Sequence, residues 1–439
     1  MDWISSAIFF LFLSFFEFCS PVVIDKILLY VVPNFTCFIN MKLLIVEPEG
    51  TGHHMALYVR LLVRSAVKRG WEIHLLTTAM AIRHPAFKLV QSECKQLVIH
   101  LMPNFELAHN RSWPGLLLDQ FRCYMAILLG FKDIIPSEAP DFIYIVNIDH
   151  IDKIMAILGT PFGKFKFSGM MMNIKFHRNQ MQIGSSSRSD WLYEKLFLKV
   201  LKIKTLKYLT VIDEPFSHYA RRSEEPGYGK LILVPDVGDL HGNISVMNAR
   251  TFLGIPDNSF AILVYGALTP KKGVEQLLQA VSAFDLSDVV VVLAGVQDDR
   301  IRELLSEPLA MDLITTGHLL VFQGFHNEVQ EYRVFRAANA VWVGYIGNSF
   351  GSSGVLYQSC SIGVPVLATS NGLVGWLVKQ HKVGLTFDPT VVEDVAKSIT
   401  LLLNDPNLMG VLSENAEVLA MSHTAIKFGD AICDAIQQE

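Results

Sequence analysis

Apolar residues along the chain fall into short continuous runs that are separated by longer stretches of helical periodicity. A short apolar run predicts a strand buried on both faces, and apolar residues spaced three and four apart predict a helix that covers a sheet. Because the two patterns alternate, we expect an α/β protein with parallel sheets. The predicted strands span 43–46, 71–77, 97–101, 142–146, 166–171, 208–212, 231–236, 260–266, 289–294, 319–323, 340–343 and 364–368.

The domain organisation follows from length and from changes in composition. A chain of 439 residues exceeds one ordinary core, so two domains are expected. We assign an apolar extension to 1–40, a first α/β domain to 41–230, a second to 231–420 and a C-terminal segment to 421–439. The polar, glycine-containing stretch 237–248 marks the linker.

The first forty residues fit two interpretations. Two apolar runs are each shorter than the ~20 residues of a spanning helix, and Pro33 breaks the second. Asp2 stands where a signal peptide carries basic residues. Met41 directly precedes the first predicted strand and suits a start residue. The segment is either an upstream extension without a structural role, including a start-site artefact, or a membrane-associating hairpin.

Net charge and cysteine content limit the expected binding partners, cofactors and cellular compartment. The formal net charge of −5 supplies no basic field, so nucleic acid is not an expected partner. Hydrophobic residues make up 51% of the chain, which suits buried parallel strands. The six cysteines are scattered without a C-x-x-C pair, and histidines show no metal-ligand spacing. We therefore expect free thiols in a reducing, cytoplasmic compartment, no bound metal and no cofactor.

A glycine-containing turn follows the first predicted strand. Gly50, Gly52, His53 and His54 lie between this strand and the next helix, where ligands of such folds bind. The turn lacks the phosphate loop of nucleoside triphosphatases and the third glycine of a dinucleotide fingerprint. The histidines are therefore candidates for contact with a polyol or a leaving anion, or they only cap and pack the loop.

Asp149 and His150 follow the predicted strand 142–146, so they are expected on the same ligand-binding edge. An aspartate beside a histidine can orient a substrate hydroxyl or share its proton. The alternative is that the aspartate caps the helix that begins near residue 151.

In the second half, Gly266, Lys271 and Lys272 follow the predicted strand 260–266 and precede a helix. Lysines at this edge can bring charge to a phosphate. The alternative is that they are ordinary solvated loop residues.

A small-residue loop leads into a further helix at Gly351, Ser352, Ser353, Gly354 and Val355. Unpaired amides and the positive end of the helix dipole suit a phosphate there, and the glycines leave room for its approach. We interpret the stretch as a diphosphate cradle; an ordinary capped helix is the alternative.

Together these motifs resemble the family-4 retaining glycosyltransferases of GT-B fold. The matching pieces are 50–54, 265–273, 349–368, 371–372 and 383–385, and the resemblance extends over nearly all of the chain from Met41. It implies two facing Rossmann-like domains with a cleft between them. The second domain would bind a nucleotide-diphosphate sugar and the first an acceptor, and a helix around 424–437 would return to the first domain.

The resemblance also implies roles and shows departures. Lys272 would hold the diphosphate, Gln358 would contact ribose, and Gly324 with Phe325 would border the base. The family usually has an arginine where this chain has Ala267, and glutamates where it has Phe350 and Gln358.

We therefore expect a retaining, metal-independent transferase that moves a hexose from a nucleotide-diphosphate sugar to a hydroxyl acceptor. Lys272, His150 and Asp149 are the catalytic candidates. Peripheral association with the cytoplasmic face of a membrane is a further expectation. Two alternatives use the same fold: a two-domain epimerase or phosphorylase, and a catalytically impaired nucleotide-sugar-binding or scaffold protein, which the departures favour.

Overall fold

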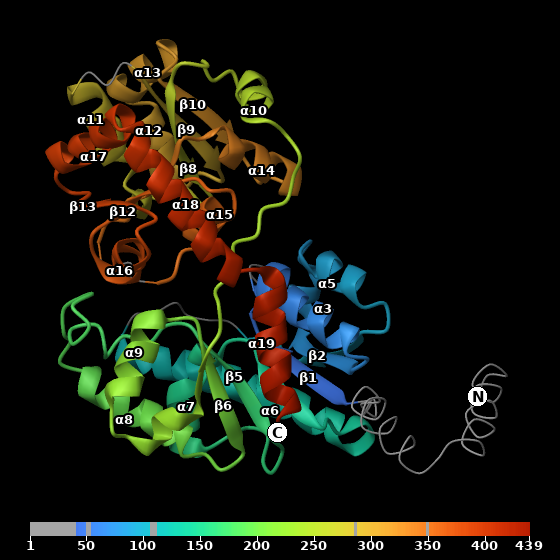
Figure 1. Ribbon diagram of the computed structural model, residues 1–439. Coiled ribbons are helices and arrows are strands. Elements are labelled where there is room, and N and C mark those ends of the chain that lie inside the picture. The colour runs from blue at the N-terminus through green and yellow to red at the C-terminus, as the bar shows by residue number, and fades with distance from the viewer. Residues whose placement is uncertain (1–40, 50–53, 106–111, 285–287, 348–350) are drawn as a thin grey trace, which may run out of the picture.

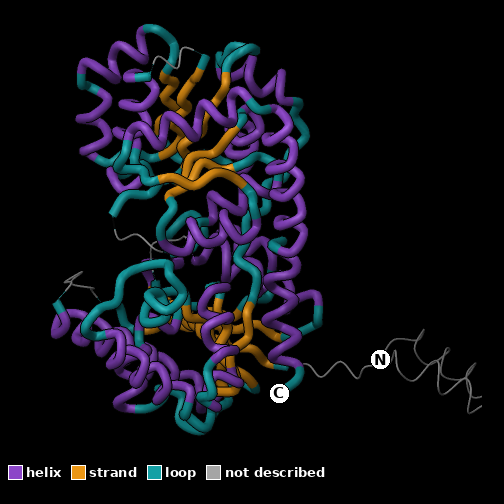
Figure 2. The backbone as a smooth tube through the Cα atoms, turned by 60° about the vertical axis from the view of Figure 1, so that its left-hand side comes forward, coloured by secondary structure: helices purple, strands orange, loops and turns teal. Residues whose placement is uncertain are grey.

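The computed structural model describes residues 41–49, 54–105, 112–284, 288–347 and 351–439. It has two α/β domains, each built on a parallel sheet with helices on both faces (Figure 1). Figure 2 shows the two sheets in separate halves of the molecule, with the C-terminus beside the first. The predicted two-domain α/β class is confirmed.

The first sheet has the strand order β3-β2-β1-β4-β5-β6-β7, and all of its pairs are parallel. Alternate residues of β1 enter different cores: Leu43 and Ile45 pack with α3 and α19, whereas Leu44 and Val46 pack with α6. Burial on both faces explains the unbroken apolar runs in the sequence. The strands are β1 (Lys42–Glu47), β2 (Glu72–Thr78), β3 (Val98–Met102), β4 (Phe142–Ile145), β5 (Phe167–Met171), β6 (Leu206–Val211) and β7 (Leu231–Leu233).

Helices connect these strands and cover the sheet. Their bounds are η2 (Met55–Val59), α3 (Arg60–Lys68), α4 (Ala79–Arg83), α5 (Phe87–Glu93), α6 (Trp113–Glu138), η3 (Ile148–His150), α7 (Asp152–Leu158), α8 (Asp190–Leu201), α9 (Glu214–Arg222) and η4 (Pro226–Lys230). None of the helices within the described ranges has the combination of length and apolarity needed to cross a bilayer.

The second sheet has the order β10-β9-β8-β11-β12-β13 and is also parallel. Its strands are β8 (Phe260–Tyr265), β9 (Val289–Gly295), β10 (Leu319–Gln323), β11 (Ala340–Val343), β12 (Val366–Thr369) and β13 (Gly384–Phe387). Its helical segments are α10 (Val246–Leu253), η5 (Pro270–Lys272), α11 (Val274–Ala283), α12 (Asp299–Leu305), α13 (Pro308–Thr315), α14 (Glu328–Ala337), α15 (Gly354–Ser361), α16 (Gly372–His381), α17 (Val392–Asn404) and α18 (Pro406–Ser422).

Each sheet reverses its strand order at one point. In the first sheet the reversal lies between β1 and β4, and in the second between β8 and β11. Connections leave such neighbouring strands in opposite directions, which opens a crevice at their carboxyl ends where ligands of α/β folds bind. The segments that follow β1, β4, β8 and β11 are therefore the places to look for a site.

The chain passes between the domains twice. After β7 an irregular segment leads to the second domain, and after α18 the helix α19 (Ala425–Gln437) returns to pack on α3 (Figure 1). Gly429 permits this packing, because a Cβ there would lie 2.3 Å from the Ser65 hydroxyl oxygen. Arg69 Nη1 then lies 2.8 Å from an Asp430 carboxylate oxygen.

Two details differ from the sequence-based expectation. The strand near residue 231 was assigned to the second domain, but β7 pairs with β6 and belongs to the first sheet. Apolar periodicity in the sequence predicts a helix over 116–129, but α6 spans Trp113–Glu138 and is longer at both ends. Gly130 lies in close contact within it, since a Cβ there would be 2.9 Å from both Leu76 Cδ1 and Met102 Cβ.

Candidate active site

The turn after β8 directs one lysine inward and its neighbour outward. Lys272 Nζ donates a hydrogen bond to the Tyr265 carbonyl oxygen at 2.6 Å, whereas Lys271 is exposed. Gly273 ends the turn with φ 66°, and a Cβ there would lie 2.4 Å from the Gly344 carbonyl oxygen. Only glycine fits both the left-handed backbone and this close approach. The local backbone therefore fixes which lysine faces the protein.

The environment of Lys272 makes it an unusual cation. Burial lowers the pKa of Lys272 from 10.5 to about 8, because the charged form loses solvation. The ammonium also lies 5.4 Å from the centre of the Tyr345 ring, within the range of a cation–π contact. An anion that reached Lys272 would restore the solvation that burial removes.

The start of α15 lies beside the same tyrosine. Ser353 precedes the helix in an extended conformation, but its hydroxyl is 2.7 Å from the Tyr345 hydroxyl and does not cap the helix. The Ser352 hydroxyl donates to Asp236. The first amides of a helix have no partners within it, so without a side-chain cap they remain available to a ligand. A Cβ on Gly351 or Gly354 would meet no atom of the described residues within 4 Å, so these residues leave room at this end.

Gln358 has a carboxylate neighbour. Its Nε2 donates a hydrogen bond of 2.7 Å to Glu331 Oε1, from the adjacent helix α14. Burial raises the pKa of Glu331, although hydrogen bonds from Tyr265 and Gln358 oppose this shift. Glu331 was not a sequence-based candidate, because nothing in its local pattern shows that α14 packs beside α15. The carboxylate missing at position 358 is thus supplied nearby by another helix.

Gly324 and Phe325 follow β10, at the same end of the sheet as the lysine turn but at its edge. The Gly324 amide donates to the Gly295 carbonyl oxygen at 3.1 Å, and its φ of 111° suits glycine. Phe325 is 90% exposed, so its ring is free to cover a ligand. The next residue, His326, has its ring 6.0 Å from that of Tyr265, which connects this loop to the end of β8.

A polar cluster lies at the switch point of the first sheet. His54 Nδ1 lies 3.2 Å from Glu47 Oε2 and 3.0 Å from Glu49 Oε2, and His150 Nε2 lies 3.3 Å from Glu49 Oε2. Burial lowers the pKa of both histidines, but the glutamates outweigh it and the net shift is upward. Both histidines were sequence-based candidates, whereas Glu47 and Glu49 were missed. Gly50, Gly52 and His53 lie outside the described residues, as does Phe350.

Asp149 has a different environment from that of His150. One of its carboxylate oxygens accepts hydrogen bonds from the amides of Met172 and Asn173, both at 3.0 Å. Burial and the nearby Asp152 raise the pKa of Asp149 to about 6. These hydrogen bonds anchor the segment after β5, and the charge of Asp149 also helps to raise the pKa of His54 and His150. The predicted N-cap is also not formed by Asp149, because Ile151 precedes α7.

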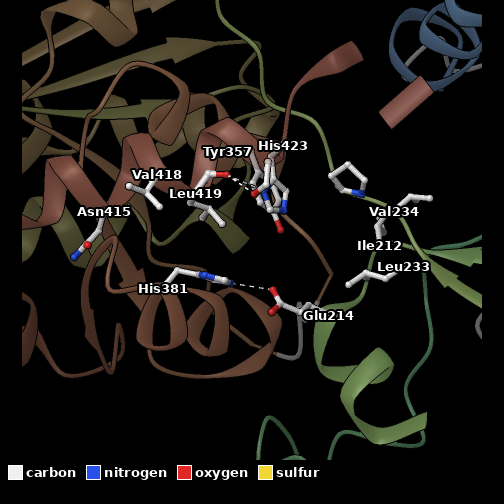
Figure 3. A pocket seen from close by; sticks show the side chains of 12 residues that line it. Ile212, Glu214, Leu233, Val234, Tyr357, His381, Asn415, Val418, Leu419 and His423 are labelled. Carbon is white, nitrogen blue, oxygen red and sulfur yellow. Dashed lines mark hydrogen bonds and ion pairs between the residues drawn. The ribbon is translucent and has the colours of Figure 1, made fainter. Parts of the chain in front are cut away.

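A pocket of about 430 Å³ lies between the domains (Figure 3). First-domain residues such as Leu233 face second-domain residues such as Tyr357 across it, and a bond of 2.9 Å between His381 Nε2 and Glu214 Oε2 joins the two sides. Lys272 and Ser353 do not line this pocket. It adjoins α15 through Tyr357 and is separate from the charged groups around Tyr345.

The sequence of the second domain is similar to those of known glycosyltransferases. Residues 247–418 match the sequence model of the family "Glycosyl transferases group 1". An uncharacterized glycosyltransferase of Methanocaldococcus jannaschii is 27% identical over 172 residues, covering 39% of this chain and 43% of that protein. A D-inositol 3-phosphate glycosyltransferase of Mycolicibacterium vanbaalenii is 30% identical over 207 residues, covering 42% and 44%. The chain thus spans about two fifths of the length of the curated relatives it matches.

Solved structures match over a larger share of the chain. Sucrose-phosphate synthase from Thermosynechococcus elongatus has a TM-score of 0.66 at 16% identity, covering 91% of this chain and 98% of that one. HepE of Anabaena, in complex with UDP and glucose, has a TM-score of 0.62 at 14% identity, covering 91% and 100%. This likeness establishes the fold. The protein has the GT-B fold of glycosyltransferases, and its second domain matches the glycosyl transferases group 1 family over residues 247–418.

Proposed function

We propose that this protein is a retaining glycosyltransferase that transfers a hexose from a nucleotide-diphosphate sugar to a hydroxyl acceptor. One observation carries the proposal: the Lys272 ammonium and the uncapped start of α15 are both in contact with Tyr345, at the switch point of the second sheet. A half-buried cation and helix amides without a side-chain cap, together at one place, form a site for a diphosphate.

The chemistry follows from charge development. As the bond between the sugar and the diphosphate breaks, negative charge grows on the departing phosphate oxygen. Lys272 and the amides of Ser352 to Val355 would stabilise that charge without a metal ion. Retention follows when the acceptor attacks the face from which the nucleotide leaves and gives its proton to the departing phosphate oxygen. This route needs no protein nucleophile.

The acceptor would bind to the first domain. His54 and His150, held by Glu47 and Glu49, provide paired donors and acceptors for hydroxyl groups. The nearby carboxylates raise the pKa of His150 and favour its protonated form, which can donate a hydrogen bond to an acceptor hydroxyl. Asp149 would support His150 indirectly by fixing the segment after β5.

The comparisons suggest the first compounds to test. HepE was solved with UDP and with UDP-glucose, so UDP-glucose is the first donor. Several relatives are D-inositol 3-phosphate glycosyltransferases, so that inositol phosphate is the first acceptor. A panel of other nucleotide sugars and polyols should accompany this pair.

The experiment measures transfer and hydrolysis with the full chain, with and without a chelator. Nuclear magnetic resonance of the product determines whether the anomeric configuration is retained. We expect transfer that persists in the chelator and falls strongly in Lys272→Ala, whereas Lys271→Ala retains most of it. Equal losses in the two variants would contradict the assignment of the lysines.

A second candidate function is binding without turnover. Position 267 carries alanine where the family usually has arginine. The side-chain amide of Gln358 already donates a hydrogen bond to Glu331. If nucleotide sugars bind but no donor in the panel is transferred or hydrolysed, a binding or scaffold role is favoured. The variant Ala267→Arg then distinguishes an impaired enzyme from a binding protein. A gain of turnover in this variant would show that the site is impaired and still catalytic.

A further inference from the structure

Two histidines and a glutamate meet on the first domain, away from the carboxyl ends of the strands. His74 lies near the start of β2, His100 in the middle of β3, and Glu138 is the last residue of α6. Leu76 is the register partner of His100, so His74 and His100 occupy diagonal positions on one face of the sheet. That face is the one covered by α6, which brings Glu138 to the pair.

The three side chains present one ligand atom each to a common point. His74 Nδ1 and His100 Nε2 are 2.8 Å apart, and each lies 3.3 Å from Glu138 Oε2. A zinc ion bonds such atoms at about 2.0–2.2 Å with tetrahedral angles, which places its ligand atoms roughly 3.3–3.5 Å apart. The triangle already has nearly this size. An ion would therefore need only a small widening of the histidine pair.

The surroundings fix the orientation of the first histidine. His74 is 1% exposed, and its Nε2 lies 2.8 Å from Glu72 Oε1. When Nε2 carries the proton and donates it to this carboxylate, the lone pair of Nδ1 is directed at the other two ligand atoms. A carboxylate behind a ligating histidine is the usual support of a metal site. Glu72 Oε1 also forms an ion pair with Lys42 Nζ at 3.3 Å.

The third ligand lacks a better partner. Glu138 Oε2 is buried and makes no hydrogen bond of good geometry with any residue in the described part of the chain. A single proton shared by His74 Nδ1 and His100 Nε2 would form one hydrogen bond between the histidines. Glu138 Oε2 would then still lack a donor. A divalent cation would satisfy all three atoms at once.

We propose that His74, His100 and Glu138 bind one divalent transition-metal ion, and that zinc fits best. Two imidazoles and one carboxylate suit Zn²⁺, and a water molecule would complete the tetrahedron. The cluster is remote from both switch points, so the ion would act structurally and join the end of α6 to β2 and β3. This site is separate from the glycosyl-transfer site proposed above.

The test uses the full chain, stripped with a chelator and dialysed against Zn²⁺ or Co²⁺. We expect one equivalent of zinc by elemental analysis, a melting temperature that rises with zinc concentration, and the intense visible absorption of tetrahedral Co²⁺. The cobalt spectrum of the unaltered protein needs no variant, so it stays informative if variants fold poorly.

Variants locate the ion. We expect H100A and E138Q to lose the bound zinc and the cobalt spectrum. H218A is the matched control, because His218 is also paired with a glutamate, at 3.7 Å, and should retain both. H150A disrupts the Glu49–His54–His150 group, which has similar composition. Absence of stoichiometric metal, or its loss in H150A but not in H100A, would overturn the proposal.

Discussion

The buried ammonium of Lys272 predicts a pH dependence for nucleotide binding. In the unliganded protein, burial holds the pKa of Lys272 at about 8. A diphosphate bound at the proposed site would lie against the ammonium and favour its charged form, which would raise this pKa toward its ordinary value of 10.5. Binding above neutral pH must therefore take up a proton, and affinity must fall as the pH rises.

The size of the effect follows from the two pKa values. With a pKa of about 8, the ammonium is about 90% charged at pH 7 and about 10% charged at pH 9. In the complex it stays charged throughout this range. The apparent dissociation constant should therefore rise about tenfold from pH 7 to pH 9, which is ~1.4 kcal/mol.

The stability of the unliganded protein should change in the opposite direction. The unfolded chain keeps its proton up to about pH 10.5, whereas the folded chain loses it near pH 8. Between these values the unfolded state binds more protons, so this group makes the free energy of unfolding rise with pH. A fall in affinity over pH 7–9 is then not explained by unfolding driven by Lys272.

Isothermal titration of UDP at pH 7, 8 and 9 tests this reasoning. Repeating it in buffers of different ionisation enthalpy counts the protons, and about half a proton should be taken up at pH 8. Lys272→Met should bind at least tenfold more weakly at pH 7, with little change up to pH 9. Lys271→Met is the control and should keep the slope. A slope that survives in Lys272→Met would refute the assignment.

Three further predictions concern the supporting structure. Gly273→Ala should lower the free energy of unfolding by at least ~1 kcal/mol more than Gly254→Ala in urea titrations, because both glycines have positive φ but only Gly273 has a carbonyl oxygen at 2.4 Å. Gln358→Glu places a second carboxylate beside Glu331; the pKa of the pair should rise, so the melting temperature should fall between pH 5 and pH 8. His381→Ala removes a partly exposed bond between the domains and should cost about 1 kcal/mol or less in thermal unfolding, and a much larger loss would mean that this bond holds the domains together.

The sequence predicted the strands well because both sheets are parallel and buried. The apolar run of β9 is shorter than an ordinary helix and rich in β-branched valine, so a strand follows from its length and composition. The strand β7 shows the limit. It has three residues, and nothing within them indicates whether they pair with β6 or with a strand of the next domain.

Some residues of the candidate site could be predicted from the sequence, and others could not. Lys272, Ser353 and His150 belong to turns that follow strands, so the fold rule places them at the correct edge. Glu331 joins Gln358 through the packing of α14 beside α15, which local pattern does not report, whereas Glu49 stands in the turn after β1 and was within reach of the same rule. The group formed by His74, His100 and Glu138 was missed for a related reason: the helix that carries Glu138 was predicted to end near residue 129.

The two passages of the chain between the domains lie next to each other. The amide of Ala425, at the start of α19, donates a hydrogen bond of 2.5 Å to Asp239 in the first passage. Two adjacent chain connections joined by a hydrogen bond form a hinge. Rotation of one domain relative to the other about this hinge is then the easiest relative movement. Such a connection resists shear and dissociation of the two domains, so facing surfaces that part would return to the same alignment.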